Sequence, residues 1–323
     1  MTHPADTYAL VADIGGTNTR CALAQGTALV PGTVRRYANA DHPTLEAVLR
    51  RFVADEGGVD ARAACVAVAG PVRDGQARMT NLDWQIDTGT VARATGAEHV
   101  AILNDLQAQG HALGHIDPGD IRTILAFPAA SPQATRLVIG VGTGFNAAPV
   151  FATPTGRFVA ASESGHVNLP VRSPADQRLA DAVGAEHGFA AVEDVLSGRG
   201  FAAVYAHLGA EAGDPRAADA AVIMSGLTLG TDLRAKDAVQ VMVRMLGMVA
   251  GNLALTQLPF GGIYLIGGVS RALAPYLVPF GFAAAFRDKG RFGPFMDHFG
   301  VGVVEDDCAA LTGCAAHIAT FGG

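Results

Sequence analysis

Two glycine turns that carry a threonine are the groups in this chain best suited to bind phosphate. The first is Asp13-Ile14-Gly15-Gly16-Thr17 and the second is Gly142-Thr143-Gly144, and each follows a hydrophobic run. Glycine has no Cβ, so such a turn can bring backbone N–H groups and a hydroxyl against a phosphate. Finding the pattern twice predicts two phosphate-binding hairpins on two related lobes, although Gly-Thr-Gly alone is also common in strand turns.

Asp13 stands where the first predicted strand enters its glycine turn. A carboxylate at this place can hold a hydrated Mg²⁺ beside nucleotide phosphates. The alternative is a turn aspartate that bonds to its own backbone. The Gly15-Gly16-Thr17 sequence that follows favours the phosphate interpretation.

Lysine is scarce in this chain, which limits how phosphates can be bound. The only lysines are Lys236 and Lys289, and neither follows a glycine. The Gly-Lys-Ser/Thr sequence of a P-loop is therefore excluded. Any nucleotide phosphates must be bound by backbone amides, hydroxyls, arginines or a metal ion.

Asn104 and Asp105 follow a predicted strand over 100–103 and open a predicted helix. In open α/β sheets, ligands bind at the carboxyl ends of the strands. An aspartate there can accept a proton from a substrate hydroxyl. Taken in isolation, capping the helix is the more frequent role of such a residue.

A further polar group, Ser162-Glu163-Ser164-Gly165-His166, puts an acid and an imidazole three residues apart in a predicted loop. These types suit metal ligation, hydrogen bonding to a polyol or an ordinary surface loop. Metal ligation lacks partners, because no cysteine or second histidine is close in the sequence. Glu193, taken alone, is interpreted as an acid that caps a helix over 193–206.

Gly267 and Gly268 follow a predicted strand over 263–266. They would allow a flat ligand such as adenine to approach closely, or form a tight turn into a helix. No G-x-G-x-x-G follows the first strand, so a dinucleotide site loses support.

The elements that must position these groups alternate between strands and helices, which is typical of α/β lobes with mostly parallel sheets. The predicted strands are 8–12, 21–24, 64–69 and 100–103 in a first lobe, and 137–141, 263–266 and 301–305 in a second that begins near residue 116; the predicted helices are 44–54, 90–95, 173–187, 193–206, one that starts at 238, and 308–319.

The composition is that of a globular protein with two cores. Half of the 323 residues are hydrophobic, 16% are charged, and the 40 glycines are dispersed among apolar runs. This predicts turns and close packing rather than a flexible linker. The formal charge of −7, with no basic tract, argues against a nucleic-acid partner.

No signal peptide is predicted, because the N-terminus lacks a basic segment and a long apolar core. The uncharged run 245–270 is long enough for a membrane span, but Asn252, Pro259 and Gly261-Gly262 interrupt it. We therefore predict a buried helix, a turn and a strand, and no membrane partner.

The cysteines lie among apolar or small residues and form no Cys-x-x-Cys motif; they are Cys21, Cys65, Cys308 and Cys314. Buried free thiols are the favoured interpretation, and they fit a reducing cytoplasm.

Taken together, these pieces resemble the bacterial ATP-dependent glucokinase family, the hexokinase-like branch of the actin-type sugar kinases. The likeness runs nearly end to end and rests on short motifs in a specific order: Leu10–Arg20, Met79-Thr80-Asn81, Asn104-Asp105, Gly142-Thr143-Gly144, Glu163-x-x-His166, Glu193-x-Val195-Leu196-Ser197-Gly198, Gly251–Leu255, Gly267-Gly268 and Ala284–Phe292.

The resemblance implies a two-lobed, ribonuclease H-like ATPase fold, with a mixed sheet and flanking helices in each lobe. It implies a small domain of residues 1–115 plus 304–323, a large domain of residues 116–303 and an active-site cleft between them. Family members generally form homodimers, so a homodimer is expected.

The resemblance also implies a role for each motif. Asp105 would be the base for the 6-hydroxyl, and Asp13 would lie near Mg²⁺, with water between them. The sugar would be bound by Asn81, Asn104, Asp105, Glu163, His166 and Glu193; ATP would be bound by Ala12, Asp13, Ile14, Gly15, Gly16, Thr17, Gly142, Thr143, Gly144, Gly267 and Gly268.

The activity implied is ATP-dependent phosphorylation of glucose to glucose 6-phosphate, the entry step of glycolysis. The alternatives are a kinase for mannose, fructose or N-acetylglucosamine, and a sensor that binds hexose and nucleotide without turnover. The sugar-kinase and repressor family with a Cys/His zinc motif is a poor match, because this chain has neither that motif nor a DNA-binding extension.

Five residues depart from the family pattern. Phe145-Asn146 continues the second hairpin where a further glycine is usual, and Ser162 and Ser164 replace glycines around Glu163. Arg199 stands where proline is common. These departures bear on rate and hexose preference more than on the type of reaction.

Overall fold

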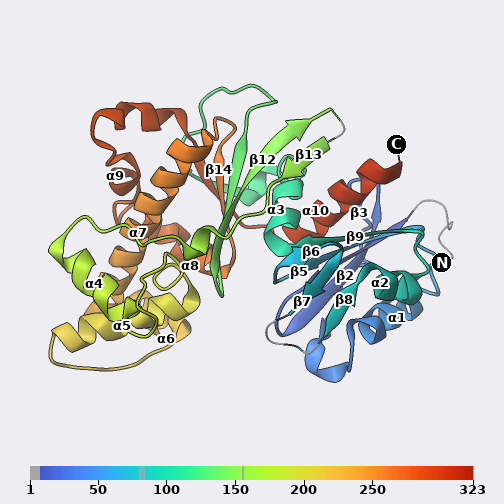
Figure 1. Ribbon diagram of the computed structural model, residues 1–323, viewed down its shortest axis with the longest axis horizontal. Helices are drawn as coiled ribbons and strands as arrows, with labels where there is room; N and C mark the ends of the chain where they lie inside the picture. The colour runs from blue at the N-terminus through green and yellow to red at the C-terminus, as the bar shows by residue number, and fades with distance from the viewer. Residues whose placement is uncertain (1–7, 80–81, 83, 155, 323) are drawn as a thin grey trace. The chain divides into compact units, whose positions relative to one another are not determined.

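The computed structural model of the protein describes residues 8–79, 82, 84–154 and 156–322 (Figure 1). Contacts divide the chain into two compact units. Unit 1 comprises Met1–Pro118, Ala152–Val159 and Asp306–Gly323, and unit 2 comprises Gly119–Phe151 and Ala160–Glu305. Each unit is described by itself below.

The main sheet of unit 1 has the strand order β3-β2-β1-β5-β9, with β4 paired to β2. The strands are β1 (Ala9–Ile14), β2 (Asn18–Gln25), β3 (Ala28–Leu29), β4 (Arg35–Ala38), β5 (Ala63–Val68) and β9 (His99–Asn104). Strands β1, β5 and β9 are parallel, with Asp13 opposite Ala67 and Ala67 opposite Leu103. Their carboxyl ends therefore meet at one edge, which carries Asp13 and Asn104.

Successive side chains of these strands point to opposite faces of the sheet, so unit 1 has a hydrophobic core on each face. Leu10 and Ile14 pack with residues of α1 (Leu45–Asp55) and α2 (Thr88–Thr95). Val11, on the opposite face, packs with α3 (Asp105–Ala112) and α10 (Ala309–Ile318). The last two helices touch so closely that a Cβ on Gly313 would lie 1.7 Å from the Ala108 carbonyl oxygen.

The second six-stranded sheet, most of which belongs to unit 2, has the order β10-β15-β14-β11-β12-β13, and β11, β14 and β15 are parallel. Its strands are β10 (Ile121–Leu125), β11 (Arg136–Val141), β12 (Phe145–Thr153), β13 (Gly156–Val159), β14 (Ile263–Ile266) and β15 (Val301–Val304). The end of β12 and all of β13 belong to unit 1 by their contacts.

The remaining elements cover these sheets or connect their strands (Figure 1). They are α4 (Pro174–Gly184), α5 (Gly198–Glu211), α6 (Ala220–Thr228), α7 (Leu233–Gln257), α8 (Gly268–Leu277), α9 (Phe282–Arg287), the small sheet of β6 (Val72–Arg73), β7 (Gln76–Arg78) and β8 (Gln85–Asp87), and the 3₁₀ turns Asn39–Asp41, Pro118–Asp120, Ser164–His166, Gly290–Phe292, Pro294–His298 and Ala319–Gly322.

Helix α7 forms the centre of the unit 2 core. By length and composition alone it could cross a membrane, but 67% of its most apolar 18-residue window is buried inside the protein. Met242, Leu246 and Ala250 all belong to this core. Core packing accounts for the apolar composition of this helix. The prediction of a buried helix, a turn and a strand over 245–270 is confirmed by α7 and β14.

Two motifs of the family resemblance meet where α7 packs on α9. Lys289 Nζ donates hydrogen bonds to Asn252 Oδ1, at 2.9 Å, and to the Met248 carbonyl oxygen, at 3.2 Å. A Cβ on Gly251 would lie 2.6 Å from the Phe286 carbonyl oxygen. These motifs therefore form part of the packing between α7 and the segment 286–289.

Most predicted elements are present within a few residues of their predicted bounds, and Thr44 caps α1 as expected by accepting the Ala47 N–H. The prediction for Glu193 as a helix-capping acid is wrong. Helix α5 begins at Gly198, and the Ser197 hydroxyl caps it by accepting the Gly200 N–H. Val195 and Leu196 lie before the helix and are buried in the core, so the helix starts after them and not at Glu193.

Candidate active site

Unit 1 holds the first hairpin, Ala12 to Thr17, between β1 and β2. Its Gly15 N–H donates to the Asn18 carbonyl oxygen at 3.0 Å, which closes the turn. Asn39 braces it from outside: the Asn39 Nδ2 donates to the Gly15 carbonyl oxygen, and its Oδ1 accepts the Thr19 hydroxyl, both at 2.8 Å. Asn39 is 2% exposed, and no motif in the sequence pointed to it.

The Asp13 carboxylate is partly buried, with 18% of its side chain exposed, and lies 3.7 Å from Arg20 Nε. Burial raises the pKa of Asp13, and the Arg20 charge opposes that rise. No cluster of three or more metal-ligating side chains occurs among the described residues. A single carboxylate suits Mg²⁺ that is held mainly by water and substrate phosphates, not a cage made of protein alone.

Asn104 and Asp105 lie at the same sheet edge as Asp13. Asn104 is the cap of α3: its Oδ1 accepts the Leu106 N–H, and the Gln107 side chain accepts the Asn104 N–H. Its Nδ2 donates to the Gly70 carbonyl oxygen at 2.9 Å. Capping thus falls to Asn104, and Asp105 is the first residue of the helix.

Asp105 is a carboxylate with a perturbed proton affinity. Burial raises its pKa to about 6, the hydrogen bond from the Leu106 N–H opposes the rise, and the Asp13 charge adds to it. A carboxylate with a pKa closer to neutrality is a better proton acceptor than an ordinary aspartate. The arrangement suits general base chemistry.

Unit 2 holds the second hairpin, Gly142 to Gly144, between β11 and β12. The Gly142 N–H donates to the Gly144 carbonyl oxygen at 2.9 Å, and its own carbonyl oxygen accepts the Gly198 N–H at 2.8 Å. Gly267 lies against the same strand end, because a Cβ there would be 2.4 Å from the Val141 carbonyl oxygen. Its φ of +95° also favours glycine.

Gly268, by contrast, is exposed, and a Cβ built there would meet no described atom within 4 Å. Because β11 and β14 are parallel neighbours, Gly267 and Gly268 open at the same edge as the second hairpin. The backbone at this edge is therefore open to a ligand.

The Glu163 loop lies directly beside the second hairpin. Gly165 packs on Phe145 so tightly that a Cβ would lie 2.2 Å from the Phe145 carbonyl oxygen. Glu163 and His166, which lie before and after Gly165 in the sequence, are both exposed. Both are therefore free to meet a polar ligand.

Three of the departures from the family pattern are partners of one another. Asn146 Oδ1 accepts the Ser164 N–H at 2.9 Å, and Asn146 Nδ2 donates to the Ser162 carbonyl oxygen at 2.6 Å. The Ser162 and Ser164 hydroxyls lie 2.8 Å apart. Together these residues tie the Glu163 loop to β12, and the sequence alone did not reveal the link.

Glu193 joins the same group. Its Oε2 accepts the Phe145 N–H at 2.8 Å, and its backbone N–H donates to the Gly165 carbonyl oxygen at 2.9 Å. The structure thus brings Asp13, Asn104 and Asp105 together in unit 1; in unit 2 it brings together Gly142–Gly144, Glu163, His166, Glu193 and Gly267-Gly268. Asn81, the remaining predicted sugar contact, lies outside the described residues.

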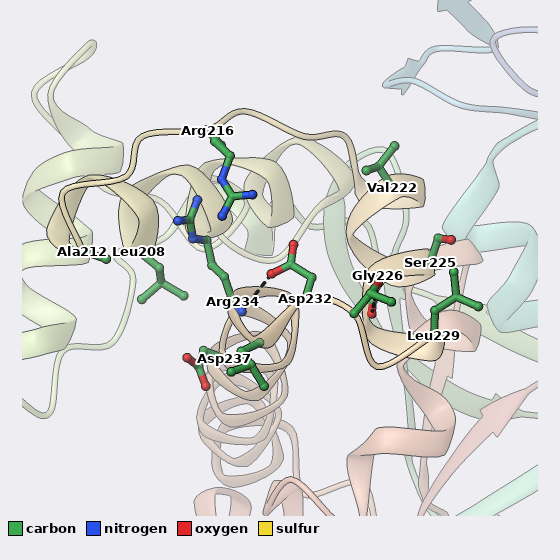
Figure 2. Close-up of a pocket in the computed structure, with 12 residues that line it drawn as sticks. Leu208, Ala212, Arg216, Val222, Ser225, Gly226, Leu229, Asp232, Arg234 and Asp237 are labelled. Carbon is green, nitrogen blue, oxygen red and sulfur yellow. Dashed lines mark hydrogen bonds between the residues drawn. The ribbon is translucent and has the colours of Figure 1, made fainter.

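A cavity of about 810 Å³ lies elsewhere in unit 2, among α5, α6 and α7 (Figure 2). Its Asp232 carboxylate already accepts the Tyr205 hydroxyl at 2.7 Å and the Arg234 backbone N–H at 3.0 Å. None of the predicted site residues that the structure describes lines it. The cavity is therefore separate from the candidate site.

Comparison with known proteins gives the same picture for nearly the whole chain. The family model described as Glucokinase matches residues 10–321. A glucokinase from Saccharophagus degradans is 31% identical over 95% of this chain and 97% of its own length. The crystal structure of a glucokinase from an Antarctic psychrotroph, 30% identical, has a TM-score of 0.87 and covers 97% of this chain and 98% of that one.

A more distant structure has the same fold. The ROK family glucokinase from Streptomyces griseus, in complex with glucose and AMPPNP, is 21% identical, with a TM-score of 0.65 over 96% of this chain and 99% of its own. The predicted fold class is therefore confirmed: it is the two-lobed, actin-like and hexokinase-like ATPase fold. The chain belongs to the glucokinase family, as its sequence motifs predicted.

Proposed function

We propose that this protein is a glucokinase that transfers a phosphoryl group from ATP to the 6-hydroxyl of glucose and so produces glucose 6-phosphate. Family membership supports the activity, and the Streptomyces griseus relative was crystallised with glucose and an ATP analogue. The observation that carries the mechanism is Asp105, a half-buried carboxylate with a pKa of about 6 at the carboxyl ends of three parallel strands.

In this proposal Asp105 orients the 6-hydroxyl and takes its proton as the phosphoryl group is transferred in line. Phosphoryl transfer depends mainly on positioning and charge stabilisation, so a P-loop lysine is not required. Asn81, Asn104, Glu163, His166 and Glu193 bind the remaining hydroxyls of the sugar.

The two glycine hairpins bind the triphosphate. Ala12–Thr17 and Gly142–Gly144 offer backbone N–H groups and threonine hydroxyls, and Gly267-Gly268 lies beside the adenosine. Asp13 would hold a hydrated Mg²⁺, which when bound would supply positive charge beside the phosphates.

We also propose that the small domain comprises residues 1–115 plus 304–323 and the large domain residues 116–303. The protein acts in the cytoplasm as a homodimer. The cysteines of the described residues are free thiols, three of them buried, which is compatible with a reducing compartment. Light scattering on the purified protein tests the dimer.

A coupled assay for ADP release tests the proposed activity with glucose, mannose, fructose and N-acetylglucosamine as acceptors. We expect the highest kcat/KM with glucose, and none without added Mg²⁺. A preference for another hexose would change the substrate while keeping the reaction. Binding of glucose and ATP with no ADP release would instead identify a sensor.

A further inference from the structure

The Glu193 carboxylate lies against the second hairpin and not in open solvent. Its Oε2 accepts the Phe145 N–H at 2.8 Å. A Cβ on Gly144 would lie 2.4 Å from the same oxygen, so the carboxylate and the hairpin are in contact. One of the two carboxylate oxygens is therefore engaged by the hairpin.

Arg199 engages the other oxygen. Its Nη2 donates to Glu193 Oε1 at 3.1 Å. The Arg199 side chain is 80% exposed, whereas that of Glu193 is 18% exposed. An ion pair with so exposed a member contributes little to stability. The guanidinium can therefore leave Glu193 at little cost.

The backbone next to Arg199 is bonded to the same hairpin. The Gly198 N–H donates to the Gly142 carbonyl oxygen at 2.8 Å, so Arg199 follows directly on a hairpin contact. The Glu193 carboxylate therefore bridges the Arg199 guanidinium and the second hairpin, to which we assign phosphate binding. Guanidinium forms strong, often bidentate hydrogen bonds with phosphate.

We propose that Arg199 couples the binding of sugar to the binding of nucleotide. In the free protein Glu193 holds the guanidinium; when ATP is bound, Arg199 turns to a phosphate oxygen and leaves Glu193 Oε1 open for a sugar hydroxyl. Coupling of this kind is reciprocal, so each ligand strengthens the binding of the other. The inference rests on the proposed function, because that function assigns phosphate to the hairpin.

Calorimetry with glucose tests the coupling, in the presence and absence of saturating AMPPNP. For the unaltered protein we expect AMPPNP to lower the Kd of glucose by about 5-fold or more. For Arg199→Ala we expect a Kd ratio near 1, and glucose binding without nucleotide at least as tight as in the unaltered protein. Arg199→Lys, which keeps the charge without the planar fork, should give a smaller ratio than arginine.

Arg178→Ala is the matched control, because Arg178 is also an exposed arginine of unit 2 that pairs with an acid, Glu211. It should leave the ratio unchanged. In a Glu193→Gln background, Arg199→Ala should add little to the loss of coupling, since the partner charge is already absent. Thermal unfolding of each variant checks that it is folded.

An unchanged ratio in Arg199→Ala, or a ratio of 1 in the unaltered protein, would overturn the coupling while leaving the proposed function intact. Failure of the unaltered protein to bind glucose or AMPPNP, or to release ADP in the coupled assay, would overturn the proposed function and this inference with it.

Discussion

Burial is the main cause of the raised pKa of Asp105, and the Asp13 carboxylate raises it further, although β5 separates their two strands. The parallel register explains the relationship, since Asp13 is opposite Ala67 and Ala67 is opposite Leu103, the second residue before Asp105. Two strand spacings amount to about 10 Å, near enough for like charges to interact in a partly buried setting. The charge of Asp13, proposed to hold Mg²⁺, therefore influences the protonation of Asp105, proposed as the base.

Asp105→Asn should abolish most turnover without unfolding the protein. An amide cannot accept the hydroxyl proton, so kcat should fall by at least about 10²-fold. Because burial raises the pKa of Asp105, its charge destabilises the fold at neutral pH. The variant should therefore gain up to about 3 kcal/mol in free energy of unfolding at pH 7, measured with urea.

Asp87→Asn is the control for that variant. Asp87 is also an acid at a helix start in unit 1, where it accepts the Thr90 N–H at 2.8 Å. It should keep its turnover. Near-normal turnover in Asp105→Asn would exclude Asp105 as the base.

The pH dependence of kcat/KM should have an acid limb governed by Asp105. The base works when deprotonated, and burial raises its pKa to about 6. Activity should be full near pH 8 and fall about tenfold per pH unit below pH 6. Rate measurements from pH 4.5 to 8.5 define this limb, and activity that stays nearly full down to pH 4.5, as an ordinary aspartate value of 3.8 would allow, would contradict the assignment.

Acid should weaken unit 1 through a histidine pair, buried His111 and half-buried His317. The rings of His111 in α3 and His317 in α10 lie 4.5 Å apart. Burial lowers the pKa of His111 to about 3, with smaller effects from the His317 and Arg157 charges, and burial also lowers the pKa of His317. Both rings are neutral in the folded protein at pH 7.

Because the unfolded chain takes up these protons near pH 6.5, their contribution to stability is present above that pH and is lost as pH falls toward 3. Urea unfolding at pH 7.5 and 5.5 should show that His111 contributes a drop of about 1 kcal/mol, to which His317 adds in the same direction. His111→Gln should reduce the drop, whereas exposed His187→Gln should not. Equal drops in all three proteins would refute the role of the pair.

Asn146→Ala should weaken glucose binding more than it slows catalysis. The Asn146 side chain fixes the Glu163 loop through Ser162 and Ser164, so its loss frees that loop to move. We expect the KM for glucose to rise about tenfold with a smaller change in kcat. Asn252→Ala is the control, because it removes the hydrogen bond to Lys289 instead, and it should leave the KM for glucose unchanged. An unchanged KM in Asn146→Ala would show that the hydrogen bonds of Asn146 to the Glu163 loop are not needed for glucose binding.

Glu163→Gln and His166→Ala should chiefly lower the affinity for glucose. Both side chains are exposed beside the second hairpin, and each offers a hydrogen-bonding group to a hydroxyl. Calorimetry should show glucose Kd values at least about tenfold higher, with AMPPNP binding little changed. Exposed His187→Ala serves as control, and unaltered glucose binding in both variants would remove these residues from the sugar site.

The sequence predicted the family, the fold class and most elements, because these depend on local patterns. Hydrophobic runs that end in glycine turns gave the hairpins of β1–β2 and β11–β12. Thr44 before an amphipathic stretch gave the start of α1. The missing Gly-Lys pair excluded a P-loop without reference to any structure.

Tertiary structure decided which residues support one another, because their contacts join segments far apart in the chain. Asn39 braces a turn more than twenty residues before it, and Glu193 reaches the hairpin at Phe145 rather than capping a helix. The sequence showed Asn146, Ser162 and Ser164 as separate departures from a pattern. Only the pairing of β12 with the Glu163 loop makes them one hydrogen-bonded cluster, since hydrogen bonds require atoms within about 3 Å and no local pattern records that distance.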